Sequence, residues 1–293
     1  MFKSYKQYSG HFLMGNGRMR VLDSKFAAIA NGRMRVWAVS LKTVRSIDKD
    51  IFNQRASLYH QAMLSYPLAR AIEFKNIITL SELKDNLIIC DVPSGGCYLS
   101  NFIQENLKII SIETSSQFLK IAQKTVNNTV ELCEDITNIS LLSSSIDRVI
   151  SLAGLHHVEN KLNFYKEAYR LLKPSGILCI ADVFEDSKVA QFLNIFVDKY
   201  NSIGHQGNFL NEKTKEEMES INFQVVHNAA ISYHWCFDSV ASMVDYCQML
   251  FGLDKANHNQ ILAGIEKYLG YHVKDEQCYM NWELHFIKSI KSN

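Results

Sequence analysis

The most constraining feature of this sequence is a series of short apolar segments that alternate with helical segments between residues 86 and 183. Strands buried on both faces of a parallel sheet are near-continuous runs of Ile, Val and Leu. The segments expected as strands are 86–91, 107–112, 129–133, 146–151 and 177–181, and those expected as helices are 98–105, 115–127 and 161–172. This alternation predicts an α/β fold, a doubly wound sheet with right-handed crossovers.

Composition supports a folded globular protein and excludes several other classes. The chain has 293 residues, 47% of them hydrophobic and 3 of them Pro, which is ordinary for a globular protein. A net charge of +1 provides little counterion-release attraction, so a genomic nucleic-acid partner is disfavoured, although a small one is not excluded. No apolar run approaches the length of about 18 residues that a membrane span needs.

The cysteines indicate the compartment. The chain has 7 of them with no C-x-x-C pair, and an odd number implies neither a zinc site nor a closed set of disulfides. Free thiols in a reducing cytoplasm are the simpler interpretation. We therefore expect a soluble cytoplasmic protein.

The first 45 residues differ from the rest in charge. They contain nine Lys and Arg and one acid, Asp23, for a net charge of +8, which leaves the other 248 residues at −7. The hexapeptide Asn-Gly-Arg-Met-Arg-Val occurs twice, at 16–21 and 31–36. We expect 1–45 to be a basic, loosely ordered extension of a domain that spans 46–293. An organelle-targeting segment and a misassigned start are alternatives that the sequence leaves open.

A glycine-containing loop follows the first strand. The strand ends at Asp91, and the loop 92–96 contains Gly95 and Gly96 before an expected helix at 98–105. Glycine lets the backbone approach a ligand closely, and a helix start offers free N–H groups to a carboxylate or a phosphate. Strand, glycine loop and helix together outline a nucleotide-binding turn.

A second acid follows the next strand. Glu113 lies 18 residues after Gly95, close to the spacing of about 20 residues at which an Asp or Glu binds ribose hydroxyls. A carboxylate there would accept hydrogen bonds from both hydroxyls and repel a 2′-phosphate. The loop and the acid together favour an adenosine ligand, but an acid at a strand end is otherwise often a helix cap.

The ordered series of motifs resembles the class I S-adenosylmethionine-dependent methyltransferases, especially the small-molecule group that includes ubiquinone and menaquinone biosynthesis enzymes. The motifs that carry the resemblance are Ile-Cys-Asp-x-x-x-Gly-Gly at 89–96, Glu113, Glu-Asp-Ile at 134–136, the strand 146–151 with Leu-His-His at 155–157, and Glu-Ala-Tyr-Arg-Leu-Leu-Lys-Pro-Ser-Gly at 167–176. The resemblance covers about 100 residues strongly and the tail more weakly. It implies a seven-stranded sheet with the last strand antiparallel and a helical insertion before that strand.

The resemblance also implies a cofactor, S-adenosylmethionine (SAM), and a set of residues that hold it. The methionine half would lie on the loop from Asp91 to Gly96, the ribose on Glu113, and the adenine on Asp135 and Ile136, while Ser151 would line the path to the methyl group. The expected cofactor-binding residues are therefore Asp91, Ser94, Gly95, Gly96, Glu113, Asp135, Ile136 and Ser151. The family's first and third loop glycines are replaced by Pro93 and Cys97, which we expect to reshape the loop rather than abolish binding.

The tail predicts a chamber for the methyl acceptor. Segments 188–200 and 212–221 have helical patterns, 223–227 and 281–287 are expected strands, and an apolar helical insertion lies between them at about 234–275. Its aromatic and Met side chains would suit an apolar acceptor. An equally good interpretation is that they are core residues. The residues concerned are Tyr233, Trp235, Phe237, Met243, Tyr246 and Phe251.

Methyl transfer is an in-line displacement, in which a general base can assist by removing a proton from the acceptor. His156, which follows the fourth strand, and His205 are the candidate bases, with Asp182 a weaker one. We expect no metal site, because the ten histidines contain no H-x-x-x-H pair.

The sequence thus predicts a methyltransferase that acts on a small, partly apolar molecule at oxygen, nitrogen or carbon. It does not choose among those atoms. Two alternatives stay open: a catalytically silent binding protein with this fold, and an NAD-dependent dehydrogenase, although the loop lacks the further glycine that a dinucleotide needs.

Overall fold

The computed structural model describes residues 28–30, 33–35, 47–125, 129–133 and 135–292. The chain divides into two compact units, residues 1–46 and 47–293, one residue from the expected boundary. In the first unit, β1 (Ala28–Ala30) and β2 (Arg33–Arg35) pair antiparallel. The prediction that 1–45 is loosely ordered otherwise falls outside the described residues.

The second unit contains the predicted sheet. Its strands lie in the order β5-β4-β3-β6-β7-β10-β8, and a further strand, β9, pairs with β10. The first five of these strands are parallel, whereas β10 runs antiparallel to both β7 and β8. The strands are β3 (Ile88–Asp91), β4 (Lys108–Glu113), β5 (Thr129–Leu132), β6 (Ile146–Leu152), β7 (Leu172–Asp182), β8 (Phe223–Phe237), β9 (Tyr271–Lys274) and β10 (Gln277–Lys291). The doubly wound sheet with an antiparallel last strand is therefore confirmed.

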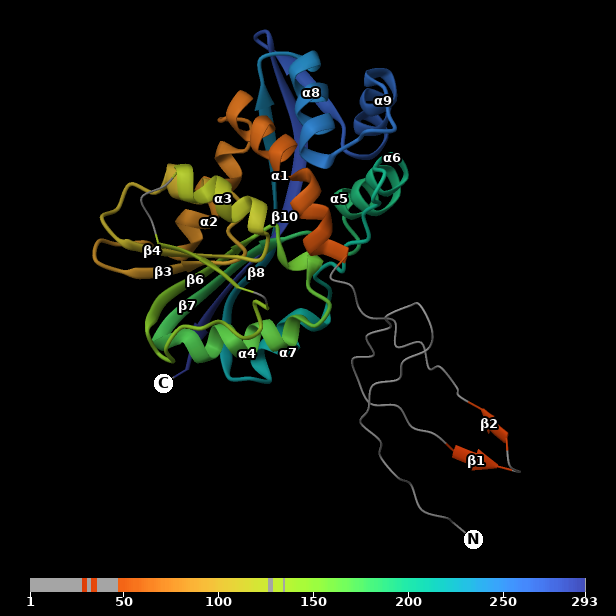
Figure 1. Ribbon diagram of the computed structural model, residues 1–293. Helices are drawn as coiled ribbons and strands as arrows, with labels where there is room; N and C mark the ends of the chain where they lie inside the picture. Colours follow the sequence, from red (N-terminus) through yellow and green to blue (C-terminus); the bar gives the residue numbers. More distant parts are fainter. Residues whose placement is uncertain (1–27, 31–32, 36–46, 126–128, 134, 293) are drawn as a thin grey trace. The chain divides into compact units, whose positions relative to one another are not determined.

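Helices cover both faces of this sheet (Figure 1). The helices α2 (Ala71–Ser81) and α3 (Ser116–Thr125) lie on one face, and α4 (Lys161–Leu171) and α7 (Lys213–Glu219) lie on the other. The strand residues Ile89 and Ile150 are fully buried in the core on one face, and Cys90 and Val149 are buried in the core on the other. Burial on both faces explains why the strands were recognisable as apolar runs.

The helix α1 and a helical segment after β7 also belong to the second unit. The helix α1 (Ile47–Ser65) packs against α3 and against α8 (Val240–Phe251). The predicted helical segment 188–200 is continuous, but its middle is a π-helix: α5 (Lys188–Gln191), η3 (Phe192–Val197) and α6 (Asp198–Tyr200). None of the helices in the described part of the chain combines the length and apolar character that a membrane crossing requires.

The predicted helical insertion is present between the last two long strands, as α8 (Val240–Phe251) and α9 (His258–Tyr268). Its surroundings differ from the prediction, because β8 and β10 are 15 residues each and extend well beyond 223–227 and 281–287. Of the six candidates for an acceptor lid, Tyr233, Trp235 and Phe237 lie in the extended part of β8, and the other three lie on α8. All six are less than a tenth exposed, and Trp235 stacks on Trp282 with ring centroids 4.1 Å apart. Packing, the alternative interpretation, is the role the structure shows for them.

A buried polar cluster ties the extended part of β8 to α2. Glu73 is fully buried and pairs with Arg70, and its Oε2 accepts hydrogen bonds from Tyr233 Oη at 3.0 Å and Trp235 Nε1 at 2.9 Å. A buried carboxylate is tolerated where a cation and several donors satisfy it. This cluster fixes the long β8–β10 arm to the helix layer above the sheet.

Candidate functional site

The chemistry of the second unit gathers where its parallel strands end. Asp91 ends β3, Glu113 ends β4, Asp182 ends β7, and Ser151 lies one residue before the end of β6. All four are buried, with exposed fractions of 4%, 3%, 1% and 0% respectively. These strands are neighbours in the sheet, so the four side chains occupy one edge, the place where open α/β sheets bind their ligands.

The loop after β3 keeps the backbone shape of a glycine loop. Gly95 has φ +55°, and a Cβ added there would meet no atom within 4 Å, so its backbone faces open space. Gly96 is the reverse case, since a Cβ would lie 2.4 Å from the Tyr98 ring. Cys97 adopts φ +60°, a left-handed conformation that glycine adopts at little cost. Cys97 therefore occupies a position whose backbone conformation favours glycine.

The expected helix at 98–105 is wrong. The segment forms a single 3₁₀ turn, η1 (Tyr98–Phe102), and the chain is extended again at Ile103. The Cys97 carbonyl accepts from both the N–H and the hydroxyl of Ser100, at 3.3 and 2.7 Å, and such local bonds compete with helix continuation. A turn this short has no useful macrodipole, so the loop has its own N–H groups, rather than a helix end, to offer a ligand.

Glu113 carries an unsatisfied polar atom. Its Oε1 accepts from the N–H groups of Thr114 and Ser115 at 2.8 and 2.7 Å, whereas Oε2 is buried without a hydrogen-bond partner. Burial raises the pKa of Glu113 to about 7 despite these backbone donors. An unpaired buried acceptor costs roughly 1–3 kcal/mol, which a ligand that donates to Oε2 would relieve.

Asp91 and Ser151 add to the same edge. Burial, and then the nearby charge of Glu113, raise the pKa of Asp91 to about 8. The hydroxyl of Ser151 is buried and has no hydrogen-bond partner. Two neighbouring buried carboxyls and unpaired oxygens fit a ligand that brings hydroxyl donors and positive charge. SAM, with its ribose hydroxyls, ammonium and sulfonium, has both.

The predicted adenine residues lie after β5. Asp135 is exposed, and its Oδ1 accepts from the N–H and the hydroxyl of Thr137, both at 2.8 Å. Ile136 is 5% exposed and packs in the core beside α4. The carboxylate of Asp135 is thus accessible to a ligand, and its role there stays a prediction.

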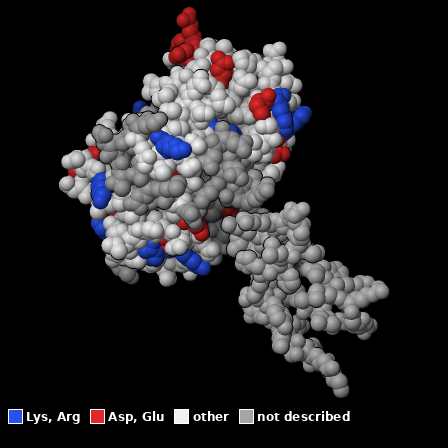
Figure 2. All heavy atoms as spheres, viewed as in Figure 1, with Lys and Arg blue, Asp and Glu red and all other residues white. Residues whose placement is uncertain are grey.

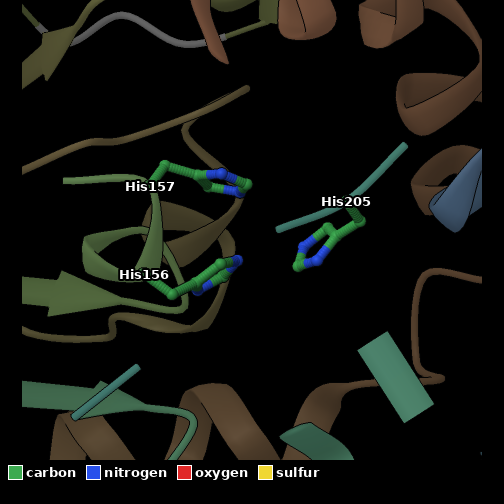
Figure 3. A group of neighbouring side chains, drawn as sticks. All are labelled: His156, His157 and His205. Carbon is green, nitrogen blue, oxygen red and sulfur yellow. The ribbon is translucent and has the colours of Figure 1, made fainter. Parts of the chain in front are cut away.

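A cluster of three histidines lies beyond the ends of β6 and β7 (Figure 3). His156 and His157 belong to the 3₁₀ turn η2 (Leu155–His157), and His205 comes from the loop after α6. The ring centroid of His156 lies 4.1 Å from that of His157 and 5.6 Å from that of His205. The two predicted catalytic residues, His156 and His205, are therefore neighbours, and the structure adds His157 to them.

Asp182 fixes the orientation of His156. Its Oδ1 lies 2.7 Å from His156 Nδ1, and its Oδ2 accepts from the backbone N–H of the same residue at 3.1 Å. Burial acts to raise the pKa of Asp182, but its interactions with His156 and the hydrogen bond from the N–H of Val183 outweigh burial and hold that pKa below its usual value. Asp182 is therefore an ionised carboxylate that positions the ring of His156.

The loop that carries His205 is bonded to the η2 turn. The N–H of Asn208 donates to the carbonyl of His156 at 2.8 Å. The ring of His205 contacts Asn194 Oδ1 through Nδ1 at 3.1 Å, and the backbone N–H of His205 donates to Asp198 Oδ1 at 2.8 Å. Burial, and then electrostatic interactions with His156, His157 and Arg55, hold the pKa of His205 well below its usual value. His205 is thus a neutral imidazole in a fixed place.

The glycine loop after Asp91 packs against the loop that leads to His156, so the buried carboxyls and the histidine cluster lie in adjacent loops. Gly154, two residues before His156, packs so closely on the glycine loop that a Cβ would lie 2.5 Å from Pro93 Cγ. The N–H of Val92 donates to the carbonyl of Ile150 at 2.9 Å. The helix α1 is a further neighbour of the glycine loop that the sequence did not indicate. Its His60 Nδ1 contacts Tyr98 Oη at 2.8 Å. The periodicity of α1 predicted a helix but gave no sign of which loop it touches.

Comparisons with known proteins agree with this geometry. Residues 90–180 match the family model described as a methyltransferase domain. The chain is 29% identical over 137 residues to Ribosomal RNA-processing protein 8 of Arabidopsis thaliana, covering 46% of this chain and 42% of the relative. It is 26% identical over 127 residues to the arsenite methyltransferase of Aquipseudomonas alcaligenes, covering 38% and 37%. The chain therefore spans less than half the length of these curated relatives.

The fold is shared with solved structures. A SAM-dependent methyltransferase from Thermotoga maritima superposes with a TM-score of 0.56 at 16% identity, over 83% of this chain and 99% of that one. Residues 90–180 are therefore a methyltransferase domain, and the sheet that contains them has the fold of class I SAM-dependent methyltransferases. The resemblance seen in the sequence motifs is confirmed at the level of this class.

The unpaired oxygen of Glu113 generates a first prediction. Glu113→Ala should weaken SAM binding by about 1.5–3 kcal/mol, the range for hydrogen bonds to a charged group. Glu113→Gln is the sharper variant, because its amide oxygen can still accept from Thr114 and Ser115 while the second acceptor is lost. Calorimetric titration measures both, with Glu216→Ala on the exposed side of α7 as control. Unchanged affinity in both Glu113 variants would remove the ribose assignment.

The raised pKa values generate a second prediction. With pKa values of about 8 and about 7, Asp91 and Glu113 are partly protonated near neutral pH in the ligand-free protein. A cation and hydroxyl donors favour the ionised carboxylates and lower both pKa values. The bound state then holds fewer protons, so SAM binding should release protons and should strengthen from about pH 6 to about pH 8. Calorimetry in buffers of different ionisation enthalpy counts these protons, and net uptake would contradict the assignment.

Proposed function

We propose that this protein is an enzyme that transfers a methyl group from SAM to a small, partly apolar molecule, at an oxygen, nitrogen or carbon atom. The observation that carries the proposal is the pairing of two features at one sheet edge. The unpaired buried oxygen of Glu113 lies at the end of β4, and a buried, carboxylate-oriented histidine, His156, follows β6.

The cofactor half of the site uses the residues predicted from the sequence. In this proposal the loop residues Ser94, Gly95 and Gly96, with Asp91, hold the methionine half, and Glu113 accepts from the ribose hydroxyls. Asp135 and Ile136 hold the adenine, and Ser151 lines the path to the acceptor. When bound, SAM supplies a methyl group activated by the positive sulfonium.

The histidine half acts on the acceptor. The carboxylate of Asp182 accepts from His156 Nδ1–H, which leaves the lone pair of that ring on Nε2. His156 would use this lone pair to take a proton from the acceptor, and His205, oriented by Asn194, is the second candidate base. An acceptor that is already anionic needs no base, and the site then acts by alignment.

Two observations bear on the size of the acceptor. On the face shown in Figure 2, the described Lys and Arg side chains are scattered among neutral and acidic ones rather than gathered into a basic patch. The apolar ring of Phe209 lies 5.9 Å from the ring of His156. Both favour a small, partly apolar acceptor over an RNA, and the relative named for arsenite favours a small acceptor.

An RNA acceptor is the second candidate. It is favoured by the similarity to Ribosomal RNA-processing protein 8 and by the charge of +8 in residues 1–45. The two candidates differ in one observable product. Transfer of label from methyl-labelled SAM into extracted cellular small molecules supports the first, and transfer into total cellular RNA supports the second.

The His156–Asp182 pair generates the prediction for this function. With a neutral acceptor found by that assay, His156→Gln should lower kcat by roughly 10²- to 10⁴-fold, the usual contribution of a general base. Asp182→Asn should lower kcat more than it changes KM, because it acts by positioning His156. Neither change should alter SAM affinity more than a few fold. His272→Gln, an exposed histidine on β9, is the control. An unchanged kcat in His156→Gln would remove the proton-transfer role.

A further inference from the structure

The three histidines have an arrangement that a general base does not require. One ring nitrogen of each of His156, His157 and His205 lies within 4.8 Å of the chosen nitrogens of the other two. Figure 3 shows the ring of His205 facing the rings of the other two. We propose that these three imidazoles bind a divalent transition-metal ion. The absence of an H-x-x-x-H pair gave no sign of this cluster, since His205 joins the other two from 48 residues away.

The partners of two rings indicate which nitrogen carries the lone pair that an ion needs. Asp182 Oδ1 lies 2.7 Å from Nδ1 of His156, so Nδ1 carries the hydrogen and Nε2 the lone pair. For His205 the neighbour is Asn194, whose amide orientation is fixed by Gly207: Gly207 N–H donates to Oδ1 at 2.7 Å, and Nδ2 donates to the Gly207 carbonyl at 2.9 Å. The atom 3.1 Å from His205 Nδ1 is therefore an acceptor, and the lone pair of His205 also lies on Nε2.

These outer partners are the kind that metal-binding histidines use. A histidine ligand usually donates its second ring N–H to a carboxylate or another oxygen, which fixes the tautomer and strengthens the lone pair. Here the carboxylate is Asp182 and the amide oxygen belongs to Asn194. Each of these oxygens is held in turn, by Val183 N–H and Gly207 N–H. The orientation of both rings is thus built by the fold.

The charge and geometry favour a transition metal over Ca²⁺ or Mg²⁺. Neutral imidazole nitrogens suit zinc, copper, nickel, cobalt and iron, whereas Ca²⁺ and Mg²⁺ prefer oxygen. At Zn–N distances of about 2.0–2.1 Å, ligand atoms of a tetrahedral site lie about 3.4 Å apart, so the rings would close by about 1.4 Å at most. His157 is half-buried on the short η2 turn, and side-chain rotation there can provide this movement.

Three protein ligands leave a fourth position open, as in catalytic rather than structural zinc sites. The position would hold water or a donor atom of the methyl acceptor. This role rests on the proposed function, but binding of the ion does not. A His156 ring that holds an ion no longer accepts a proton through Nε2, so in the loaded protein the ion would lower the pKa of the acceptor in its place.

The test measures metal binding directly. The full chain, stripped with chelator, is titrated with Zn²⁺ by calorimetry and with Co²⁺ by visible absorption, which is intense for a tetrahedral site. We expect one ion per chain. His205→Gln and His157→Gln should each weaken binding at least 10-fold, and Asp182→Asn should weaken it by roughly 10- to 100-fold, the usual effect of an outer partner. His258→Gln, an exposed histidine on α9, should bind as the wild type does.

Two results would overturn the proposal. One is the absence of Zn²⁺ and Co²⁺ binding by the wild type, and the other is wild-type affinity in His205→Gln and His157→Gln, which would place the ion elsewhere. SAM titration of each variant shows that it is folded and separates this proposal from the methyltransferase function. Retained SAM binding without metal binding contradicts the metal site alone.

Discussion

The parallel alignment of β4, β3, β6 and β7 is the constraint on which the rest of the structure depends. Parallel strands end at the same edge, so each residue that follows a strand meets the residues that follow its neighbours. In this chain those residues are Asp91, Glu113, Asp182 and the histidines after β6. Segments far apart in sequence therefore come together in the site because the strands that precede them are neighbours in the sheet and end at the same edge.

This edge carries a cost that a ligand would offset. Asp91 and Glu113 are buried close enough for the charge of Glu113 to raise the pKa of Asp91, and Glu113 Oε2 and the Ser151 hydroxyl have no hydrogen-bond partner. Buried polar groups of this kind are concentrated at functional sites, where they are ready for an interaction that forms on binding. The buried Glu73 cluster is the contrast, because its carboxylate is fully satisfied by Arg70, Tyr233 and Trp235 and serves the packing of β8 on α2.

The sequence predicted the features that depend on burial and strand order. The doubly wound sheet followed from apolar runs that alternate with helical segments, and its antiparallel last strand was implied by the family resemblance. The length of β8 was missed, since residues 228–230 in its middle are exposed and give no buried face to recognise. The prediction of a helix after the glycine loop was wrong for a local reason, because the hydroxyl of Ser100 donates a hydrogen bond to the Cys97 carbonyl. The histidine cluster depends on the return of the loop after α6, which no spacing between His157 and His205 indicates.

The central claim is that the edge formed by Asp91, the glycine loop and Glu113 binds SAM. The most direct measurement is calorimetric titration of the full chain with SAM, with its demethylated product S-adenosylhomocysteine, and with NAD. We predict micromolar binding of the first two and none of NAD. The pyrophosphate of NAD would meet the carboxyls of Asp91 and Glu113, and the loop lacks the further glycine that a dinucleotide needs. No binding of any of the three would contradict the account and would make the protein a member of this fold that has lost its cofactor.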